Sequence, residues 1–179
     1  MKKRGLILLM AMTLSVAAFA GCTSKTDTST LPAKTVGTAV DGNEVNIETA
    51  AMKLVNQTKA GGYTLVSTAD LKSWVDSGKE MVVIDTMPAS SFKDGHVKGA
   101  VNAELPKTQE EGTTAEQKEA FVKLLPADKN TPVVVYCGFV ACGRSDVGAV
   151  IAIQEGYTNV YRYPGGIVAW KDAGYETVK

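Results

Sequence analysis

The chain has 179 residues, of which 45% are hydrophobic and 21% are charged, with 19 basic and 19 acidic side chains. This composition suits one globular domain with a hydrophobic core and excludes a largely disordered chain. Beyond residue 21, 16 basic side chains stand against 19 acidic ones, a net charge of −3, and no Lys/Arg cluster remains to follow a phosphate backbone. Nucleic acid is therefore not expected as a partner.

The N-terminus has the pattern of an export signal. Residues 2–4 are basic, and the run Leu6–Ala20 is apolar and uncharged. This run is shorter than the roughly 20 residues that a membrane-spanning helix needs. We therefore expect a cleaved signal rather than a permanent transmembrane helix.

The segment Phe19-Ala20-Gly21-Cys22 resembles the lipobox of bacterial lipoproteins. The resemblance implies that residues 1–21 are a lipoprotein signal peptide and that Cys22 carries a diacylglyceryl thioether and an N-acyl chain such as palmitate. The protein would then be exported and lipid-anchored to the membrane, on its periplasmic or extracytoplasmic face. Thr23 follows the cysteine instead of a retention aspartate, which leaves the outer membrane open as a location. An ordinary secretory signal with an unrelated cysteine is the alternative.

Residues 22–45 are rich in small and polar side chains and predict a flexible tether, and residues 46–179 form the expected domain. Within the domain, Ile47, Ala51, Leu54 and Val55 recur at helical spacing before Gly61. This pattern predicts a short amphipathic helix, to which we assign a packing role.

From residue 63 onward, predicted strands and helices alternate. The strands are expected over 63–66, 81–85, 132–136 and 159–162, and the helices over 67–77, 115–125, 144–155 and 166–173. Such alternation predicts an α/β fold in which a parallel central sheet has helices on both faces. Ligands of these folds bind at the carboxyl ends of the strands.

Cys137 directly follows the apolar run Pro132–Tyr136, at the predicted carboxyl end of a buried strand. A glycine-containing loop then leads into a helix that begins at Arg144. Backbone N–H groups and the positive end of that helix would stabilise a thiolate, so we expect the pKa of Cys137 to fall below about 8.5. The alternative is a small buried hydrophobic residue.

Four stretches of the sequence together resemble the rhodanese family: Val82–Asp85, Phe92–Asn102, Val135–Cys137 and Gly165–Gly174. The resemblance covers roughly residues 63–179. It implies a thiosulfate sulfurtransferase-like enzyme without a cofactor or metal. Cys137 would take sulfane sulfur from thiosulfate or a polysulfide as a persulfide and pass it to a thiophilic acceptor such as a thiol.

The loop after Cys137 is the expected substrate-binding cradle, because its amides and one guanidinium can offset the charge of the leaving anion. Its members are Gly138, Phe139, Val140, Ala141, Cys142, Gly143, Arg144 and Ser145.

Three features depart from the family pattern. The loop is longer than in ordinary sulfurtransferases, Met87 stands where many relatives carry an arginine, and Cys142 adds a second thiol. Two alternatives therefore remain open. One is a non-classical carrier that handles sulfur or selenium oxyanions for a membrane-associated redox partner. The other is a dithiol redox protein that uses Cys137 and Cys142.

Two further residues are candidates for supporting roles. Asp85 ends a predicted strand near the loop, where relatives use it to hold backbone or a charged side chain. His96 is the only histidine of the chain and invites a general-base role. In the family its Gly-His stretch is a structural turn, which is the interpretation that we favour.

Overall fold

A computed structural model describes residues 43–179 of the protein. The predictions for the signal peptide, Cys22 and residues 22–42 lie outside these residues. Glu44 and Val45, which we assigned to the tether, belong instead to the first helix, α1. Within residues 43–179, none of the helices has the length and apolar character needed to cross a membrane.

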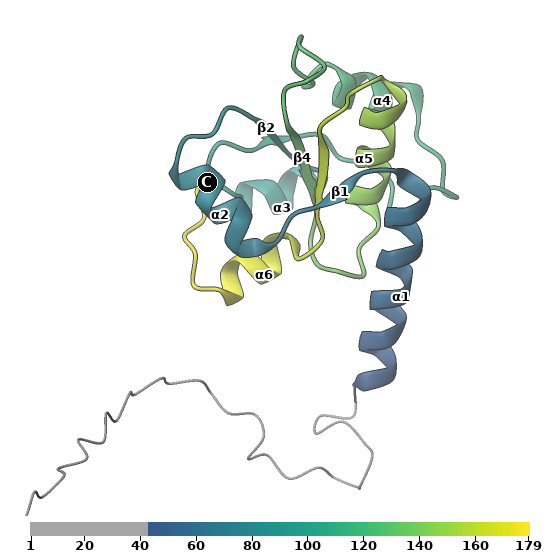
Figure 1. The fold of residues 1–179 in the computed structure, drawn as a ribbon, viewed down its shortest axis with the longest axis vertical. Coiled ribbons are helices and arrows are strands. Elements are labelled where there is room, and N and C mark those ends of the chain that lie inside the picture. The colour runs from purple at the N-terminus through teal and green to yellow at the C-terminus, as the bar shows by residue number, and fades with distance from the viewer. Residues whose placement is uncertain (1–42) are drawn as a thin grey trace, which may run out of the picture. The chain divides into compact units, whose positions relative to one another are not determined.

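Five parallel strands form one sheet, in the order β1-β5-β4-β2-β3 (Figure 1). The strands are β1 (Thr64–Leu65), β2 (Val82–Asp85), β3 (Val101–Asn102), β4 (Val133–Tyr136) and β5 (Val160–Tyr163). The helices are α1 (Glu44–Gly61), α2 (Thr68–Asp76), α3 (Ala89–Asp94), α4 (Ala115–Val122), α5 (Arg144–Gln154) and α6 (Gly166–Asp172). The predicted α/β class with a parallel central sheet is confirmed.

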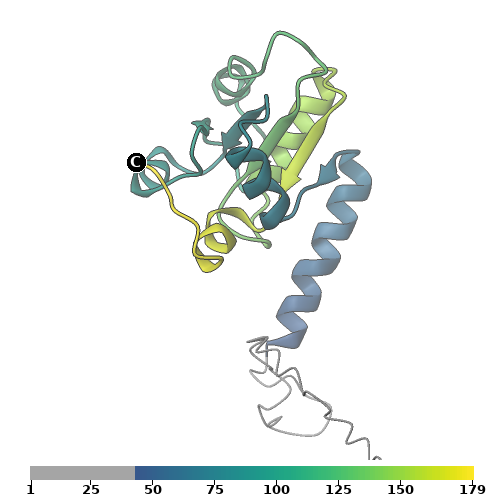
Figure 2. The ribbon, with the colours of Figure 1, turned by 60° about the vertical axis from the view of Figure 1, so that its left-hand side comes forward.

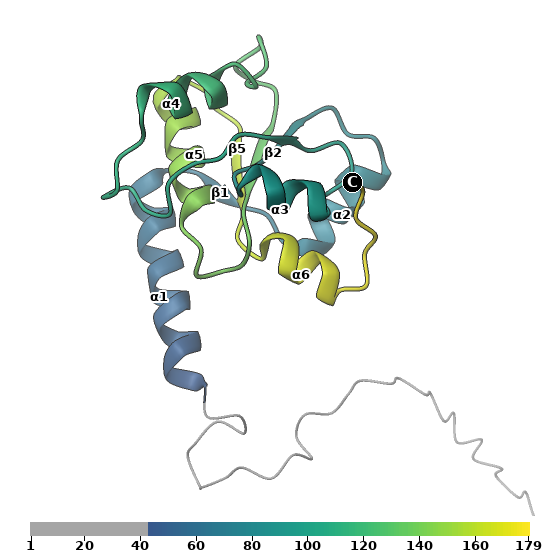
Figure 3. The same ribbon diagram turned by 180° about the vertical axis from the view of Figure 1, so that it is seen from behind.

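Helices cover both faces of the sheet, as Figures 1, 2 and 3 show from three directions. Alternate side chains of β4 point to opposite faces, so Val133 and Val135 pack with α4 and α5 while Val134 and Tyr136 pack with α2 and α6. Because β4 lies in the middle of the sheet and is buried along its length, its carboxyl end is a rigid support for the loop that follows.

Local signals in the sequence fix two of the helices. The Ser67 side chain accepts a hydrogen bond from the backbone N–H of Asp70 at 3.1 Å and begins α2. Thr114 and Gln117 form a reciprocal capping box that begins α4.

Three features of the fold differ from the prediction. Helix α3 and strand β3 were not predicted, because they span only 6 and 2 residues and carry little periodicity. Helix α1 exists, but Ile47 and Val55 of its predicted apolar stripe are 54% and 56% exposed. Helix α1 lies beside α5, and the face of α1 that carries Lys53 and Gln57 is turned toward α5.

Candidate active site

The loop between β4 and α5 is held in place by the N-terminus of α6. The backbone N–H groups of Ile167 and Val168 donate to the carbonyls of Cys137 and Gly138, each at 3.0 Å. Gly166 makes this approach possible, because its φ is +61° and an added Cβ would lie 2.4 Å from the Cys137 carbonyl oxygen. The Gly-Gly-Ile stretch of the sequence thus positions the loop.

Cys137 lies at the carboxyl end of β4, as predicted, but its side chain points into the protein and is only 1% exposed. Its Sγ lies 3.3 Å from the Cys142 carbonyl oxygen and 3.2 Å from the Ser145 hydroxyl oxygen. Burial raises the pKa of Cys137 well above its ordinary value. Our expectation of a lowered pKa for this thiol is therefore wrong in this structure.

Cys142 has the electrostatic setting that we expected for Cys137. Its thiol is partly exposed and lies directly before the N-cap of α5. A hydrogen bond from the Cys137 thiol lowers the pKa of Cys142 to about 5, aided by the backbone N–H groups of Gly138 and Arg144 and by the Arg144 charge. These groups favour negative charge on the Cys142 sulfur.

Arg162 fixes the floor of the site and was missed by the sequence analysis. This fully buried side chain donates to the Cys142 carbonyl at 3.0 Å and to the Ser145 hydroxyl at 2.9 Å. It also donates to the Tyr63 hydroxyl at 3.0 Å and lies 3.8 Å from the Asp146 carboxylate. The sequence did contain a signal for this role: a single arginine stands within the otherwise uncharged strand β5. A charged side chain that is buried in a sheet needs hydrogen-bonding or charged partners.

Arg144 begins α5 beside Cys142. Its guanidinium donates to the Leu105 carbonyl and lies 3.8 Å from the Glu104 carboxylate. These contacts hold the side chain at the rim of the loop, where its charge still favours the Cys142 thiolate.

An open cleft of about 390 Å³ lies over the loop. It is lined by Lys53, Met87, Pro88, Lys107, Thr108, Phe139, Ala141, Cys142, Gly143 and Arg144. Among these described residues are three cations and no carboxylate, so the cleft favours an anionic ligand. Lys53 reaches it from α1 and donates to the Ala141 carbonyl at 3.2 Å.

The rhodanese-like domain family matches residues 67–173, which is more than half of the chain. The protein belongs to the rhodanese family.

Among curated relatives, rhodanese-like domain-containing protein 14 of Arabidopsis thaliana is 25% identical over 61% of this chain and 63% of its own length. The tRNA uridine(34) hydroxylase of Acinetobacter baumannii is 31% identical over 56% of this chain. This chain spans only 30% of that hydroxylase. The thiosulfate sulfurtransferase GlpE of Coxiella burnetii is 26% identical over 56% of this chain and 82% of its own length.

Two solved structures share the fold. The thiosulfate sulfurtransferase of Pseudomonas aeruginosa has a TM-score of 0.56 at 17% identity, over 72% of this chain and 22% of its own. A Rhodopseudomonas palustris protein of unknown function has a TM-score of 0.52 at 20% identity, over 72% of this chain and 93% of its own.

Some residues of the loop after Cys137 line the cleft of this rhodanese domain, and others do not. Phe139, Ala141 and Gly143 line the cleft with Cys142 and Arg144, and their contact with a substrate stays a prediction. Val140 is exposed and is not among the lining residues, and Ser145 is buried under the loop between Cys137 and Arg162. The structure thus places these last two outside the open cleft.

Asp85 holds the backbone of the segment that follows β2. Its carboxylate accepts a hydrogen bond from the backbone N–H of Met87 at 2.8 Å, and its burial raises its pKa. It holds backbone, which is one of the two roles that we expected.

His96 forms an isolated β-bridge with Val178, just before the turn at Lys98 and Gly99. Its ring stacks on Phe92 at 3.7 Å, and its backbone pairs with Val178 near the C-terminus. These contacts are consistent with the structural role that we favoured for His96. His96 is not among the residues that line the cleft over the loop.

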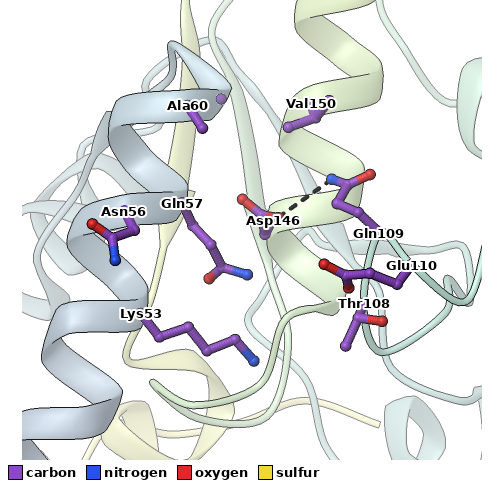
Figure 4. Close-up of a pocket in the computed structure, with 10 residues that line it drawn as sticks. Lys53, Asn56, Gln57, Ala60, Thr108, Gln109, Glu110, Asp146 and Val150 are labelled. Carbon is purple, nitrogen blue, oxygen red and sulfur yellow. Dashed lines mark hydrogen bonds between the residues drawn. The ribbon is translucent and has the colours of Figure 1, made fainter.

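A second cleft, of about 660 Å³, lies between α1, α5 and the segment 108–110 (Figure 4). Lys53 and Thr108 line both clefts, and Gln57 and Asp146 face each other across this one. Within the part of the chain that the structure describes, no group of three or more His, Cys, Asp or Glu side chains could hold a metal ion.

Proposed function

We propose that this rhodanese-family protein is a sulfurtransferase of the bacterial cell envelope. It takes sulfane sulfur from an anionic donor, thiosulfate or a polysulfide, as a persulfide on a thiol of the loop. It then hands the sulfur to a thiophilic acceptor such as a thiol, cyanide or sulfite. The relationship to the Coxiella thiosulfate sulfurtransferase supports this reaction class.

One observation carries the proposal: a thiol with a lowered pKa lies in a cleft lined by three cationic side chains. A thiolate is the nucleophile that attacks sulfane sulfur, and the cations attract a donor such as thiosulfate. Lys53 and Lys107 supply positive charge in a cleft where Met87 replaces the arginine of many relatives.

The reaction needs no outside oxidant or cofactor. The thiolate attacks the outer sulfur of thiosulfate, the donor S–S bond breaks, and sulfite leaves with the electron pair of that bond. The new S–S bond makes the persulfide. An acceptor nucleophile then takes the outer sulfur and restores the thiolate. The amides of the loop and the Arg144 charge stabilise the anionic sulfur at each stage.

A sulfur-transfer assay tests the proposed function. We expect the wild-type protein to release sulfite from thiosulfate, or to shorten inorganic polysulfide, when a thiol or cyanide is present as acceptor. The double variant Cys137→Ser/Cys142→Ser lacks both loop thiols and should lose this activity by at least about 100-fold. A wild-type protein no faster than the double variant would contradict the proposal.

The envelope location rests on the resemblance of the segment ending at Cys22 to a lipobox. We propose that Cys22 is acylated and tethers the domain to the membrane. Expression with a fatty-acid analogue should label the wild-type protein and leave Cys22→Ser unlabelled and released from the membrane fraction. Equal labelling of both proteins would contradict the anchor.

A further inference from the structure

Helix α1 brings a positive charge to the cleft over the loop from outside the part of the chain that matches the rhodanese family. The match covers residues 67–173, whereas α1 spans Glu44–Gly61. The Lys53 side chain of α1 lines the cleft of about 390 Å³. Its ammonium group donates a hydrogen bond to the Ala141 carbonyl at 3.2 Å, which fixes the charge at the loop itself. A segment beyond the family match therefore completes this cleft.

The Lys53 ammonium group has capacity for an anionic ligand. An ammonium group carries three N–H donors, and the Ala141 carbonyl takes one of them. None of the ion pairs within residues 43–179 includes Lys53. Lys53 and Glu110 both line the neighbouring cleft of about 660 Å³, but Glu110 does not line the cleft over the loop (Figure 4). An anion bound over the loop would therefore meet a cation that no carboxylate of the same cleft neutralises.

Two contacts, one helical turn apart, attach α1 to the loop. Gln57 accepts a hydrogen bond from Arg162 at 2.9 Å, and Arg162 also donates to the Cys142 carbonyl at 3.0 Å. Lys53 donates to the carbonyl of the preceding loop residue, Ala141. The ammonium group is thus held in position before a ligand arrives, so less conformational entropy is lost when the ligand binds.

We propose that Lys53 is a donor-binding residue that makes the cleft selective for anionic sulfur donors. The inference rests on the proposed sulfurtransferase function and names a residue and a substrate class for its first step. Arg144 already interacts with the Leu105 carbonyl and lies 3.8 Å from the Glu104 carboxylate, which offsets part of its charge. Lys53 has no such counter-charge, so it contributes more to the attraction of a dianion such as thiosulfate.

Steady-state kinetics with thiosulfate as the donor and dithiothreitol as the acceptor test the role of Lys53. We expect Lys53→Met to raise the KM for thiosulfate about 5- to 10-fold and to change kcat by less than about 2-fold, because a charge-assisted contact with the bound donor is lost. Lys53→Arg keeps the charge and should restore most of the affinity. A Lys53→Met protein with the KM of the wild type would overturn the inference.

Lys59→Met is the matched control. Lys59 lies on the same helix, is exposed and lines neither of the two clefts. The variant loses the same charge from the protein as a whole and should keep the KM of the wild type. A merely structural role of Lys53 would instead lower kcat without raising the KM for thiosulfate, which would also overturn the inference.

A second measurement needs no sulfur transfer. Sulfonatoethyl methanethiosulfonate is anionic and trimethylammonioethyl methanethiosulfonate is cationic, and both modify thiols. The thiolate attacks the sulfenyl sulfur, and methanesulfinate leaves with the electron pair of the broken S–S bond. The rate is followed by mass on the peptide that contains Cys137 and Cys142. The ratio of the two rates cancels changes in thiolate fraction and exposure, so it reports the charge around the thiols.

We expect the ratio of the anionic to the cationic rate to fall about 5-fold or more in Lys53→Met. The ratio should stay close to the wild-type value in Lys53→Arg and Lys59→Met. An unchanged ratio in Lys53→Met would overturn the inference.

The two measurements separate this inference from the proposed function. If the wild-type protein transfers no sulfur while the reagent ratio falls in Lys53→Met, the sulfurtransferase proposal fails and Lys53 remains the residue that selects anions at the loop. If sulfur is transferred and the KM and the ratio both keep their wild-type values in Lys53→Met, only the role of Lys53 fails.

Discussion

Replacement of Arg162 by methionine is expected to lower the free energy of unfolding by about 3–5 kcal/mol. The arginine is fully buried, and its loss leaves the carboxylate of Asp146, itself 3% exposed, without its counter-charge. Methionine also releases the Cys142 carbonyl and the Ser145 hydroxyl from their hydrogen bonds. Because these groups fix the loop that carries both thiols, we therefore expect slower sulfur uptake.

The double variant Arg162→Met/Asp146→Asn separates charge from packing. Asparagine removes the unpaired charge and still accepts the hydrogen bond that the Tyr63 hydroxyl donates at 2.6 Å. It should recover about 1–2 kcal/mol of stability in urea unfolding, while sulfur uptake by the loop stays impaired. If Arg162→Met alone has the stability of the wild-type protein, Arg162 does not hold this site together.

Gly166→Ala is expected to have the second large effect. Alanine pays about 1–2 kcal/mol for the left-handed backbone at φ +61°. Its Cβ would also lie 2.4 Å from the Cys137 carbonyl oxygen and 2.6 Å from the Gly138 carbonyl carbon. Because backbone atoms must move to relieve this contact, we expect a larger loss of stability and a displaced loop, with sulfur uptake reduced about 10-fold or more.

Gly174→Ala is the matched control. Gly174 has φ +75°, but an added Cβ there meets no atom within 4 Å. The Gly174→Ala variant should lose only the stability that the left-handed backbone conformation costs, about 1–2 kcal/mol, and should keep wild-type sulfur uptake. Equal activity of the two variants would mean that the contact between α6 and the loop does not position the thiols.

Strand patterning in the sequence was sufficient to place the loop of the candidate site between β4 and α5. The continuous apolar run before Cys137 predicts a central strand, and the helix signal at Arg144 places the loop at its carboxyl end. Which thiol faces the cleft could not be predicted in this way. The directions of Cys137 and Cys142 depend on contacts with Arg162 and with the start of α6, both distant in sequence.

The role of α1 was also beyond the sequence analysis. Its apolar residues suggested a packing stripe, yet the side chains that reach the site are the polar Lys53 and Gln57, one helical turn apart. Gln57 accepts a hydrogen bond from Arg162 at 2.9 Å. Neither residue belongs to a motif of the family resemblance, so only the packing of α1 on α5 reveals their place.

We propose that an activated thiol of this loop carries sulfane sulfur, and intact-mass measurement of the wild-type protein is the simplest test. After incubation with thiosulfate or inorganic polysulfide, we expect the protein to gain the mass of one sulfur atom, which a thiol or cyanide acceptor then removes. A mass that stays unchanged with both donors, in a folded protein whose thiols are reduced, would contradict it.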